Sequence, residues 1–501
     1  MKLKTNKHIA VIGAGLGGMS AAIALRAHGY HVDLYEKNNH LGGKLNQLEK
    51  DGFTFDLGPS IFTLPQYFRS LFQRAGKNFD DYVQISPVKP HWRNFFEDGL
   101  VLDLYKEEEL MFKELKKLSG SFETHKQEFL SFLNYSKQQY TIVESGYFAK
   151  GLDNLMDFIK HYGLFKLFFK IDHRKKMAVS IDQHFSDPHL KRIFEYFIKY
   201  VGSSALDSPG FMNLMPHIQF EYDLWYVNGG LYNLALGFEK LLNDMGVNIH
   251  LNTEIEQIEQ SSNRVKGIQI KGQGLKQYDY VVSNMEVIPA YKKLLNQPKS
   301  FMDSLKKFEP ACSGLVLHLG VKQHYPQLAH HNFFYSKDQK KHFNTVFKEK
   351  KLPDDPTIYL VAPTRSDASK APQGCDNIKI LPHIPYINEE NPYTESDYMH
   401  FKEKVLDKLE RMGLNNLRKN TIVEDMWTPL DIQKKYYSNK GSIYGVVSDW
   451  DKNYAFKAPK QSKKFKNLFF VGGSVNPGGG MPMVTLCGQN VADQLHQFDQ
   501  S

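Results

Sequence analysis

The stretch HIAVIGAGLGGMSAAIALRAHGYHVDLYE, from His8 to Glu36, decides the fold. Its first five residues form a short apolar run, which is typical of a buried parallel strand. Gly13, Gly15 and Gly18 then give the pattern G-x-G-x-x-G, and a run of strong helix formers ends at Gly29, a residue type favoured after a helix. A second apolar strand closes the stretch at its final glutamate. This order of strand, glycine turn, helix, strand and acid is the context that a dinucleotide-binding motif requires.

Each position in the motif has its own physical role. Gly13 permits a tight turn, Gly15 lets a pyrophosphate approach the backbone next to Ala14, and Gly18 allows close packing of helix and sheet. The helix N-terminus offers free N–H groups and the positive end of a dipole to phosphates. Glu36 follows at about the 20-residue spacing expected for the acid that binds an adenosine ribose hydroxyl. An acid at that place disfavours a 2′-phosphate, so NADP is a poor fit.

The residues that follow Glu36 distinguish FAD from NAD. NNHLGGK (Asn38 to Lys44) and DGFTFDLGPS (Asp51 to Ser60) resemble the flavin-containing amine oxidase and phytoene desaturase superfamily, whose members carry a second glycine pair just after the ribose acid. The resemblance implies that FAD is the cofactor. It also implies that a set of residues in these strings borders the FAD: Lys37, Gly42, Gly43, Lys44, Gly58, Pro59 and Ser60.

Two distant segments match the same superfamily. GVNIHLNTEIEQIEQ (Gly246 to Gln260) is predicted as two strands, and the resemblance places Ile255 against the adenine. LFFVGGSVNPGGGMPMVTLCGQNVAD (Leu468 to Asp493) is predicted as a strand, a glycine turn and a helix that starts near Pro482. Such a helix would direct its positive end at the flavin pyrimidine. The resemblance implies flavin contacts by Gly473, Gly480 and Met483.

The sequence therefore predicts an α/β fold of the amine oxidase and phytoene desaturase type. A discontinuous Rossmann-type FAD-binding domain is expected from residues 1–100, 226–300 and 415–501. An inserted α+β substrate domain, facing a membrane, is expected from residues 101–225 and 301–414.

Nearly the whole chain resembles bacterial carotenoid desaturases and oxygenases that act on C30 diapocarotenoids. Desaturases commonly carry T-H-P-G in the C-terminal turn, whereas Val475 to Gly478 read V-N-P-G, as in the staphylococcal-type diaponeurosporene oxygenases. Other strings that resemble this oxygenase branch are Phe197 to Ser204, Leu224 to Gly230, Tyr325 to Phe334 and Leu352 to Val361. The branch implies FAD-dependent oxidation of a terminal methyl group of a C30 carotenoid, such as 4,4′-diaponeurosporene, to the aldehyde or further to the acid. A C30 carotenoid desaturase is the alternative within the family.

No side chain is assigned as a catalytic acid or base, and no residue spacing indicates a metal site. His330 and His331 are adjacent, so on a strand they would face opposite sides and could not both enter one site. His217 and His383 each follow a proline in apolar surroundings and are expected to be structural. An amine oxidase remains a rival, as does a flavin-free lipid carrier of the GDP-dissociation-inhibitor type; the intact glycine motifs and Glu36 argue against the carrier.

Composition indicates a globular protein that could meet a membrane surface. Hydrophobic residues make up 41% and charged residues 24%, and the net charge of +8 comes without a recognisable nucleic-acid module. Three distant cysteines indicate a reducing cytoplasm. Gly146 to Lys176 mixes aromatic, aliphatic and basic residues, as an interfacial helix or a helix packed on the protein's own core would. The apolar cluster in this segment comprises Leu164, Phe165, Leu167, Phe168 and Phe169. We expect a peripheral protein on the cytoplasmic membrane face, which receives its carotenoid from lipid.

Overall fold

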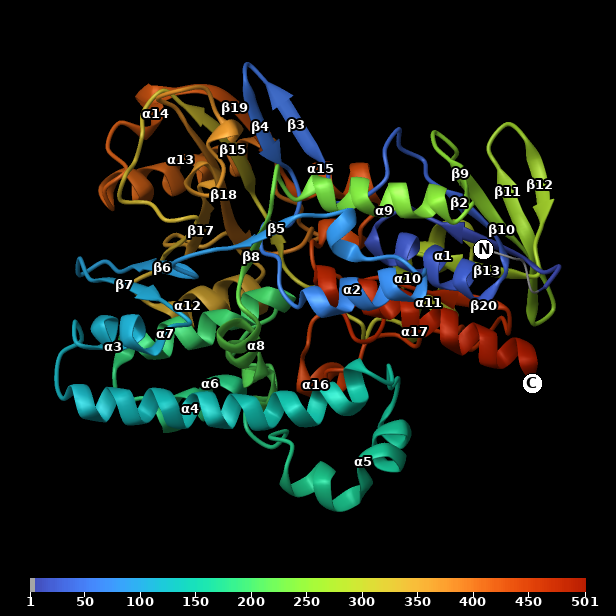
Figure 1. The fold of residues 1–501 in the computed structure, drawn as a ribbon, viewed down its shortest axis with the longest axis horizontal. Helices are drawn as coiled ribbons and strands as arrows, with labels where there is room; N and C mark the ends of the chain where they lie inside the picture. Colours follow the sequence, from blue (N-terminus) through green and yellow to red (C-terminus); the bar gives the residue numbers. More distant parts are fainter. Residues whose placement is uncertain (1–4) are drawn as a thin grey trace.

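The computed structural model describes residues 5–501, without the side chains of residues 164–169 (Figure 1). The N-terminal stretch folds as predicted into β1 (His8–Ile12), α1 (Leu16–His28) and β2 (His31–Tyr35). Gly29 ends α1 in the left-handed conformation, with φ of 99°, which glycine adopts without steric cost. Strands β1 and β2 are parallel, as the connecting helix requires.

Three separate parts of the chain build one parallel sheet. The strand order is β20-β13-β1-β2-β9, where the added strands are β9 (Asn248–His250), β13 (Tyr280–Ser283) and β20 (Leu468–Phe470). In its centre Val11 pairs with Val282 on one side and with Leu34 on the other. The prediction of a discontinuous nucleotide-binding fold is therefore confirmed. Apolar residues fill β1 because helices cover both faces of a parallel sheet.

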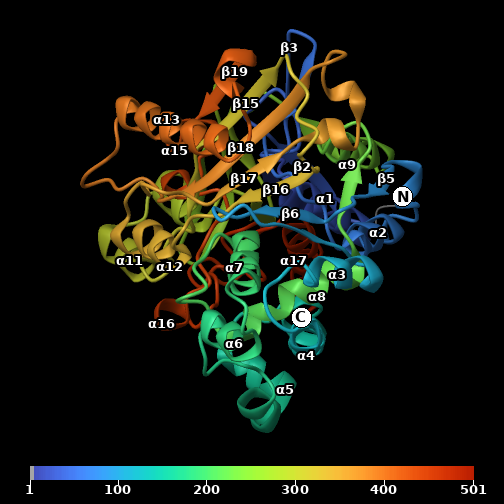
Figure 2. The same cartoon turned by 90° about the vertical axis from the view of Figure 1, so that its left-hand side faces the viewer.

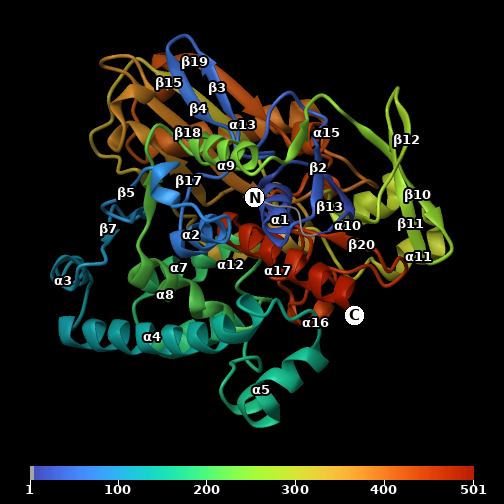
Figure 3. The ribbon, with the colours of Figure 1, turned by 45° about the vertical axis from the view of Figure 1, so that its right-hand side comes forward.

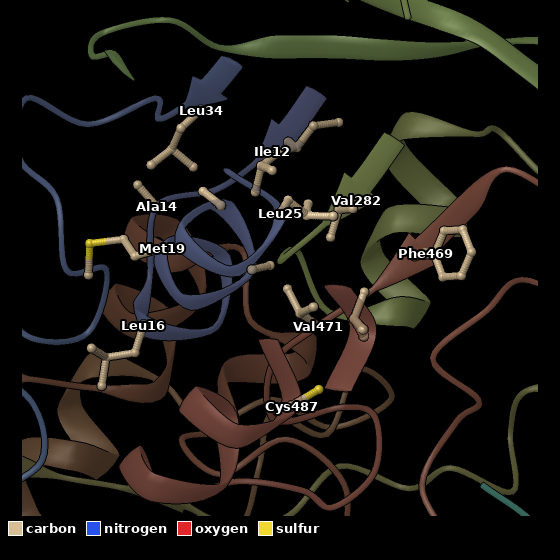
Figure 4. Packing of buried hydrophobic residues seen from close by; sticks show 14 of the residues in the cluster. Ile12, Ala14, Leu16, Met19, Leu25, Leu34, Val282, Phe469, Val471 and Cys487 are labelled. Atoms are coloured by element: carbon tan, nitrogen blue, oxygen red, sulfur yellow. The ribbon is translucent and has the colours of Figure 1, made fainter. Parts of the chain in front are cut away.

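The C-terminal helix α17 (Met481–Gln500) packs directly on α1 (Figures 1 and 3). A Cβ atom on Gly488 would lie 2.6 Å from the backbone nitrogen of Ala21, so only glycine permits this approach. The Ser20 hydroxyl donates to the carbonyl of Thr485 at 2.5 Å. Figure 4 shows Met19, Val282, Phe469 and Cys487 in the core that these helices share with the sheet. Ser20 contacts Thr485, and further along both helices His28 contacts Asp493, so α1 and α17 run in the same direction.

A second, mixed sheet lies beside the first (Figure 1), and it faces the viewer in Figure 2. Its main strand order is β19-β15-β18-β17-β16-β6-β7, and β14 pairs with β18. The bounds are β6 Trp92–Phe95, β7 Val101–Leu104, β14 Ser313–Gly314, β15 Val316–Val321, β16 His331–Phe334, β17 Ile358–Val361, β18 Asp376–Ile384 and β19 Thr421–Trp427. Smaller sheets are β3 (Gln47–Lys50) with β4 (Phe53–Asp56), β5 (Ile85–Pro87) with β8 (Trp225–Val227), and β10 (Ile255–Ser261), β11 (Arg264–Ile270) and β12 (Gly274–Gln277).

Helices surround these sheets on several sides. Next to the nucleotide-binding sheet are α2 (Pro65–Arg74), α9 (Tyr232–Asp244) and α10 (Val287–Pro289), whereas α15 (Pro429–Tyr436) contacts β19 of the second sheet. Others are α3 (Glu108–Leu115), α11 (Lys299–Ser304), α12 (Gln339–Phe343), α13 (Glu395–Arg411), α14 (Leu417–Asn420) and α16 (Trp450–Asn453). A helical layer contains α4 (Phe122–Val143), α5 (Leu155–Phe169), α6 (Met177–His184), α7 (Pro188–Tyr196) and α8 (Met215–Tyr222). Among the described helices, none combines the length and apolarity that crossing a bilayer requires.

Helix α5 lies at the periphery, with α4 between it and the sheets (Figures 1 and 3). Its backbone leaves the helical conformation at Gly163, where φ is 72° and ψ is 159°. The five apolar residues of the predicted membrane-facing cluster, at 164, 165 and 167–169, lie in the second part of this helix. Their side chains are outside the described part of the structure.

The division into two domains stays a proposal, and the strand pairings favour different boundaries. The predicted FAD domain included residues 1–100 and 415–501. Strands β6 and β19 fall in those ranges yet pair within the second sheet. Strand β6 forms a local hairpin with β7, but its other partner β16 and the partner of β19, β15, are far away in sequence, so no local pattern could have assigned the two strands to this sheet.

Candidate functional site

The glycine turn before α1 has a bare backbone because side chains have no room there. Gly13 has φ of 92°, and a Cβ on Gly18 would lie 2.0 Å from the carbonyl oxygen of Gly13. A Cβ on Gly15 would lie 2.8 Å from the side-chain nitrogen of Asn284, and one on Gly43 would lie 2.9 Å from the Cα of Gly15. The two predicted glycine motifs therefore touch each other. The backbone N–H of Gly42 stabilises this contact by donating a hydrogen bond to the carbonyl of Ala14 at 2.9 Å.

Glu36 is held at the end of β2 by three donors. One carboxylate oxygen accepts the backbone N–H of Ala14 at 2.9 Å, and the other accepts the backbone and side-chain N–H groups of Asn38 at 2.9 and 2.8 Å. The backbone N–H of Thr253 donates to the Glu36 carbonyl at 2.8 Å. Strand β10, which starts at the buried Ile255, therefore begins beside this acid, as the predicted adenine contact would require.

Two helix N-termini meet at the carboxyl edge of the parallel sheet. Neither α1, which is preceded by Gly15, nor α17, which is preceded by Gly480, has a side-chain cap. Their free N–H groups and positive dipole ends face the edge where open α/β sheets bind ligands. A Cβ on Gly480 would meet nothing within 4 Å, so this residue borders open space. Pro482 occupies the second position of α17, one residue later than the predicted first position.

Lys44 and Lys37 point to different places. The Lys44 ammonium donates to the carbonyls of Ile443 and Ser442 at 3.1 and 3.3 Å and lies 3.9 Å from a Glu286 carboxylate oxygen. Burial lowers the pKa of Lys44, yet 34% of its side chain is solvent-accessible. The side chain therefore borders an open space within the fold. Lys37 instead donates to the carbonyl of Lys435 at 2.6 Å, in the last turn of α15. Its ammonium is therefore turned toward the C-terminal end of that helix.

The segment after β4 is fixed between β18 and α9. The Lys379 ammonium donates to the Asp56 carbonyl at 2.9 Å and also to the carbonyl of Gly58. The Asp56 carboxylate accepts the N–H of Leu231 at 3.0 Å, just before α9. Pro59 and Ser60 follow this anchored point and are half-buried. Burial lowers the pKa of Lys379 to about 8.

A cavity of about 300 Å³ begins at the glycine turn of α17 and has almost wholly apolar walls. Of the flavin contacts predicted in the C-terminal block, Gly480 and Met483 lie in its wall, whereas Gly473 does not line it. Segments far apart in sequence supply the remaining walls: residues 61–64, the end of α4, α5, α8 and the loop around α16. Leu155 and Tyr454 also line it and are 53% and 64% exposed, so the cavity reaches the surface between α5 and α16.

Asn476, the residue that separates this chain from the desaturase pattern, connects the glycine turn to the cavity wall. It is fully buried, and its side-chain oxygen accepts hydrogen bonds from the Tyr147 hydroxyl and from the backbone N–H of Lys457, both at 2.8 Å. Its amide nitrogen donates to the Asp153 carbonyl at 3.3 Å. Tyr147 and Lys457 both line the cavity. Asn476 therefore fixes the shape of the cavity beside the turn.

Lys457 is the only Lys, Arg, Asp or Glu among the described residues that line the cavity. Its ammonium donates to the carbonyl of Val447 at 2.8 Å and to the hydroxyl of Ser448 at 2.7 Å. Burial lowers its pKa to about 7. Near neutral pH this lysine therefore exists in both charge states.

The histidines considered from the sequence lie away from the cavity lining. His330 is hydrogen-bonded to the Ser366 hydroxyl at 2.7 Å and His331 to the Tyr359 hydroxyl at 2.9 Å. Burial lowers the pKa of both, and of His217 and His383. They have the character of core residues.

Sequence reasoning missed several residues at the site. Asn284 lies 3.5 Å from the Cβ position of Gly13 and 2.8 Å from that of Gly15, and it directly follows β13 at the carboxyl edge of the sheet. Its place directly after a predicted strand of the parallel sheet is the one feature of the sequence that indicates Asn284 as a site residue. The backbone carbonyl of Tyr444 would lie 2.3 Å from a Cβ on Gly479, and no local pattern indicates this approach.

Comparisons with known proteins agree with this geometry. Residues 16–496 match the model of the flavin containing amine oxidoreductase family. The chain is 55% identical to a 4,4′-diapolycopene oxygenase of Methylomonas sp, over 99% of both chains. It is 50% identical to a 4,4′-diaponeurosporene oxygenase of Staphylococcus aureus (strain USA300), over 98% of both chains.

Solved structures with the same fold are much more distant in sequence. An oxidoreductase from Methanosarcina mazei has a TM-score of 0.68 at 14% identity and covers 97% of this chain and 100% of its own. A fatty acid isomerase from P. acnes has a TM-score of 0.63 at 16% identity, with 98% of each chain covered. The fold and the glycine site define a flavin-dependent oxidoreductase with FAD as its cofactor. The chain belongs to the flavin-containing amine oxidoreductase family.

The pKa of Lys457 predicts how stability depends on pH. Between about pH 7 and pH 10 the folded protein holds a neutral amine, while the unfolded chain keeps the proton up to about 10.4. The unfolded state binds more protons in that window, so stability rises with pH by at most about 1.4 kcal/mol per pH unit from this group. Lys457→Met should show a smaller rise in thermal unfolding midpoint from about pH 7 to pH 9 than the wild type. The exposed Lys463→Met serves as the control, and equal slopes in all three proteins would contradict the assignment.

Proposed function

We propose that the chain is an FAD-dependent carotenoid oxygenase that oxidises a terminal methyl group of a C30 carotenoid to the aldehyde. 4,4′-Diaponeurosporene or a similar C30 polyene is the proposed substrate. The observation that carries the proposal is the apolar cavity, which begins at the α17 glycine turn and reaches the surface. Two relatives support it, which are named 4,4′-diapolycopene oxygenase and 4,4′-diaponeurosporene oxygenase and share 55% and 50% identity with the chain.

We infer that FAD is held by the residues predicted from the sequence. The bare glycine backbone, the two uncapped helix N-termini and the open space at Gly480 fit a dinucleotide with a flat ring. The proposed contacts are Gly13, Ala14, Gly15, Gly18, Glu36, Lys37, Gly42, Gly43, Lys44, Gly58, Pro59, Ser60, Ile255, Gly473, Gly480 and Met483. The Lys37 side chain would have to break its hydrogen bond to the Lys435 carbonyl before it could reach FAD. We therefore propose that Lys37 contacts FAD through its backbone. FAD, when bound, supplies the acceptor for the electrons removed from the substrate.

The protein's own residues position the polyene and exclude water. The lining consists mainly of aromatic, aliphatic and methionine side chains, which gain free energy by covering an apolar chain. Asn476 and Tyr147 hold the wall against the glycine turn, so the end of the polyene is directed to the turn. A desaturase would use the same arrangement with a different product, and the names of the relatives favour the oxygenase.

We further propose that the cavity mouth rests on the cytoplasmic face of a membrane. Leu155, Met156 and Tyr454 are 53%, 58% and 64% exposed, and Leu155 and Tyr454 border the mouth. Large apolar side chains exposed together at a cavity entrance are typical of a surface that meets lipid. Residues 164–169 continue the same helix, and their sequence is apolar with one lysine. A carotenoid dissolved in lipid could enter the cavity from there without crossing water.

The product distinguishes the oxygenase from the desaturase. With 4,4′-diaponeurosporene and dioxygen, the FAD-loaded protein should give a product that has gained an oxygen atom and lost two hydrogens at a terminal carbon. Mass spectrometry and carbonyl derivatisation check this. A product that has only lost two hydrogens, with or without dioxygen, would assign the chain to the desaturases.

Glu36→Gln should weaken FAD binding by about tenfold or more, because a charged hydrogen-bond acceptor contributes about 1.5–3 kcal/mol. The amide also places a donor where the N–H of Ala14 already points. The bound flavin per protein after gel filtration measures the effect, and the exposed Glu256→Gln is the matched control. An unchanged flavin content at limiting FAD would remove Glu36 from the binding site.

Charging the cavity mouth should prevent membrane binding. The double variant Leu155→Asp and Met156→Asp places two carboxylates on the exposed apolar surface of α5. We expect its binding to phosphatidylglycerol vesicles to fall several-fold in a flotation assay, with FAD content unchanged. Leu275→Asp, on the distant β12, introduces a charge at an equally exposed leucine and should bind as the wild type does. Full vesicle binding by the double variant would locate the membrane contact elsewhere.

A further inference from the structure

One side chain in the cavity wall has hydrogen-bonding capacity that a hydrocarbon cannot use. Gln219, on α8, is only 1% exposed and lines the cavity together with the apolar Met215 and Ile218. Its side-chain oxygen accepts the Tyr200 hydroxyl at 2.9 Å. Its amide nitrogen has no hydrogen-bond partner among the described residues. Buried donors without an acceptor are rare in proteins and costly in free energy.

Tyr200 fixes which way the amide group faces. Burial raises the pKa of Tyr200, so its hydroxyl stays protonated and serves as the donor to the glutamine oxygen. Lys199 packs against this tyrosine: its ammonium lies 4.7 Å from the centre of the Tyr200 ring and 4.8 Å from that of Trp92. Once the oxygen of Gln219 is engaged, its two N–H bonds are left to bind something else in the cavity.

We propose that Gln219, positioned by Tyr200, binds the oxygen atom of a carotenoid end group that has already been oxidised. Two N–H donors require an acceptor such as a carbonyl or carboxylate oxygen. The remaining wall is predominantly apolar, so the ligand is a hydrocarbon with oxygen at one end. An aldehyde made from a terminal methyl group has this composition.

The consequence is selective retention of the oxygenated carotenoid. A hydrocarbon end leaves the Gln219 donors unpaired, whereas an aldehyde end satisfies them, and sites built in this way discriminate strongly against the ligand that lacks the polar atom. The enzyme therefore binds its first product more tightly than its starting substrate. The inference rests on the proposed function, because it requires that a C30 aldehyde forms.

The test compares binding of the hydrocarbon and of its aldehyde to the FAD-loaded protein. The probes are 4,4′-diaponeurosporene and the corresponding C30 monoaldehyde, delivered in detergent micelles. Wild-type protein should shift the visible absorption band of the aldehyde to longer wavelength, because a hydrogen bond to the carbonyl draws electron density along the polyene. In Gln219→Leu, which keeps the side chain's approximate size, this shift should vanish. The ratio of aldehyde to hydrocarbon affinity should fall at least tenfold.

Tyr200→Phe is the second variant, since it releases the amide without removing it. We expect a smaller loss of the same affinity ratio and a partly reduced spectral shift. The control Gln73→Leu changes an exposed glutamine on α2, and should retain both the wild-type ratio and the shift. If Gln219→Leu does not fold with FAD, the result for Tyr200→Phe decides.

Two outcomes separate the inference from the proposed function. If wild-type protein oxidises the hydrocarbon but neither variant alters aldehyde binding or its spectrum, the Gln219 site is wrong and the oxygenase stands. If wild-type protein forms no oxygenated product from the hydrocarbon, the proposed function is wrong as well.

Discussion

The close packing of α1 against α17 is the contact on which the rest of the molecule depends. Gly488 makes it possible, because any larger residue would collide with the backbone of α1 at Ala21. It joins the first and last parts of the chain over one parallel sheet and brings two helix N-termini to the same edge of that sheet. Without this contact the N-terminal glycine turn would be an isolated nucleotide motif, and the C-terminal turn would have no cofactor to border.

The two sides of the α17 glycine turn have opposite chemical character. On the sheet side lie free N–H groups, Glu36 and the half-open Lys44, which suit a charged and polar cofactor. On the other side lies a cavity with a single formally charged residue among its described lining, and burial lowers the pKa of that lysine to about 7. Asn476 maintains the boundary by hydrogen bonds to both the cavity wall and the loop before the turn. Electron transfer across this boundary would not require a charged group to cross it.

The parts of the structure that could be predicted from the sequence are those in which neighbouring residues determine the geometry. The β1-α1-β2 unit, the Gly29 terminus and the start of α17 follow from local patterns of glycine, proline and apolar residues. Residues such as Asn284, Lys457 and Gln219 could not be identified, because the turn or cavity that each of them borders is assembled only in the folded chain, from segments that are not neighbours in sequence. The same reason explains why β6 and β19 were not assigned to the second sheet, because β16 and β15, through which they join it, are distant in sequence. The cofactor FAD and the class of substrate were predicted from the resemblance to known families, because hydrophobic periodicity carries no information about either.

The shared turn between cofactor and cavity restricts how this enzyme can evolve. Residues 478–483 form a wall of the cavity and also contain the start of α17, the helix whose N-terminus we propose to face the flavin. A substitution there that admits a bulkier or shorter polyene would also alter the cofactor's environment, so the two properties cannot be varied separately. Substrate range can change with less interference on the opposite wall, where α5 and α8 contribute side chains that are independent of the nucleotide-binding sheet. Divergence among relatives with different carotenoids would then accumulate on those helices, while the turn stays nearly constant.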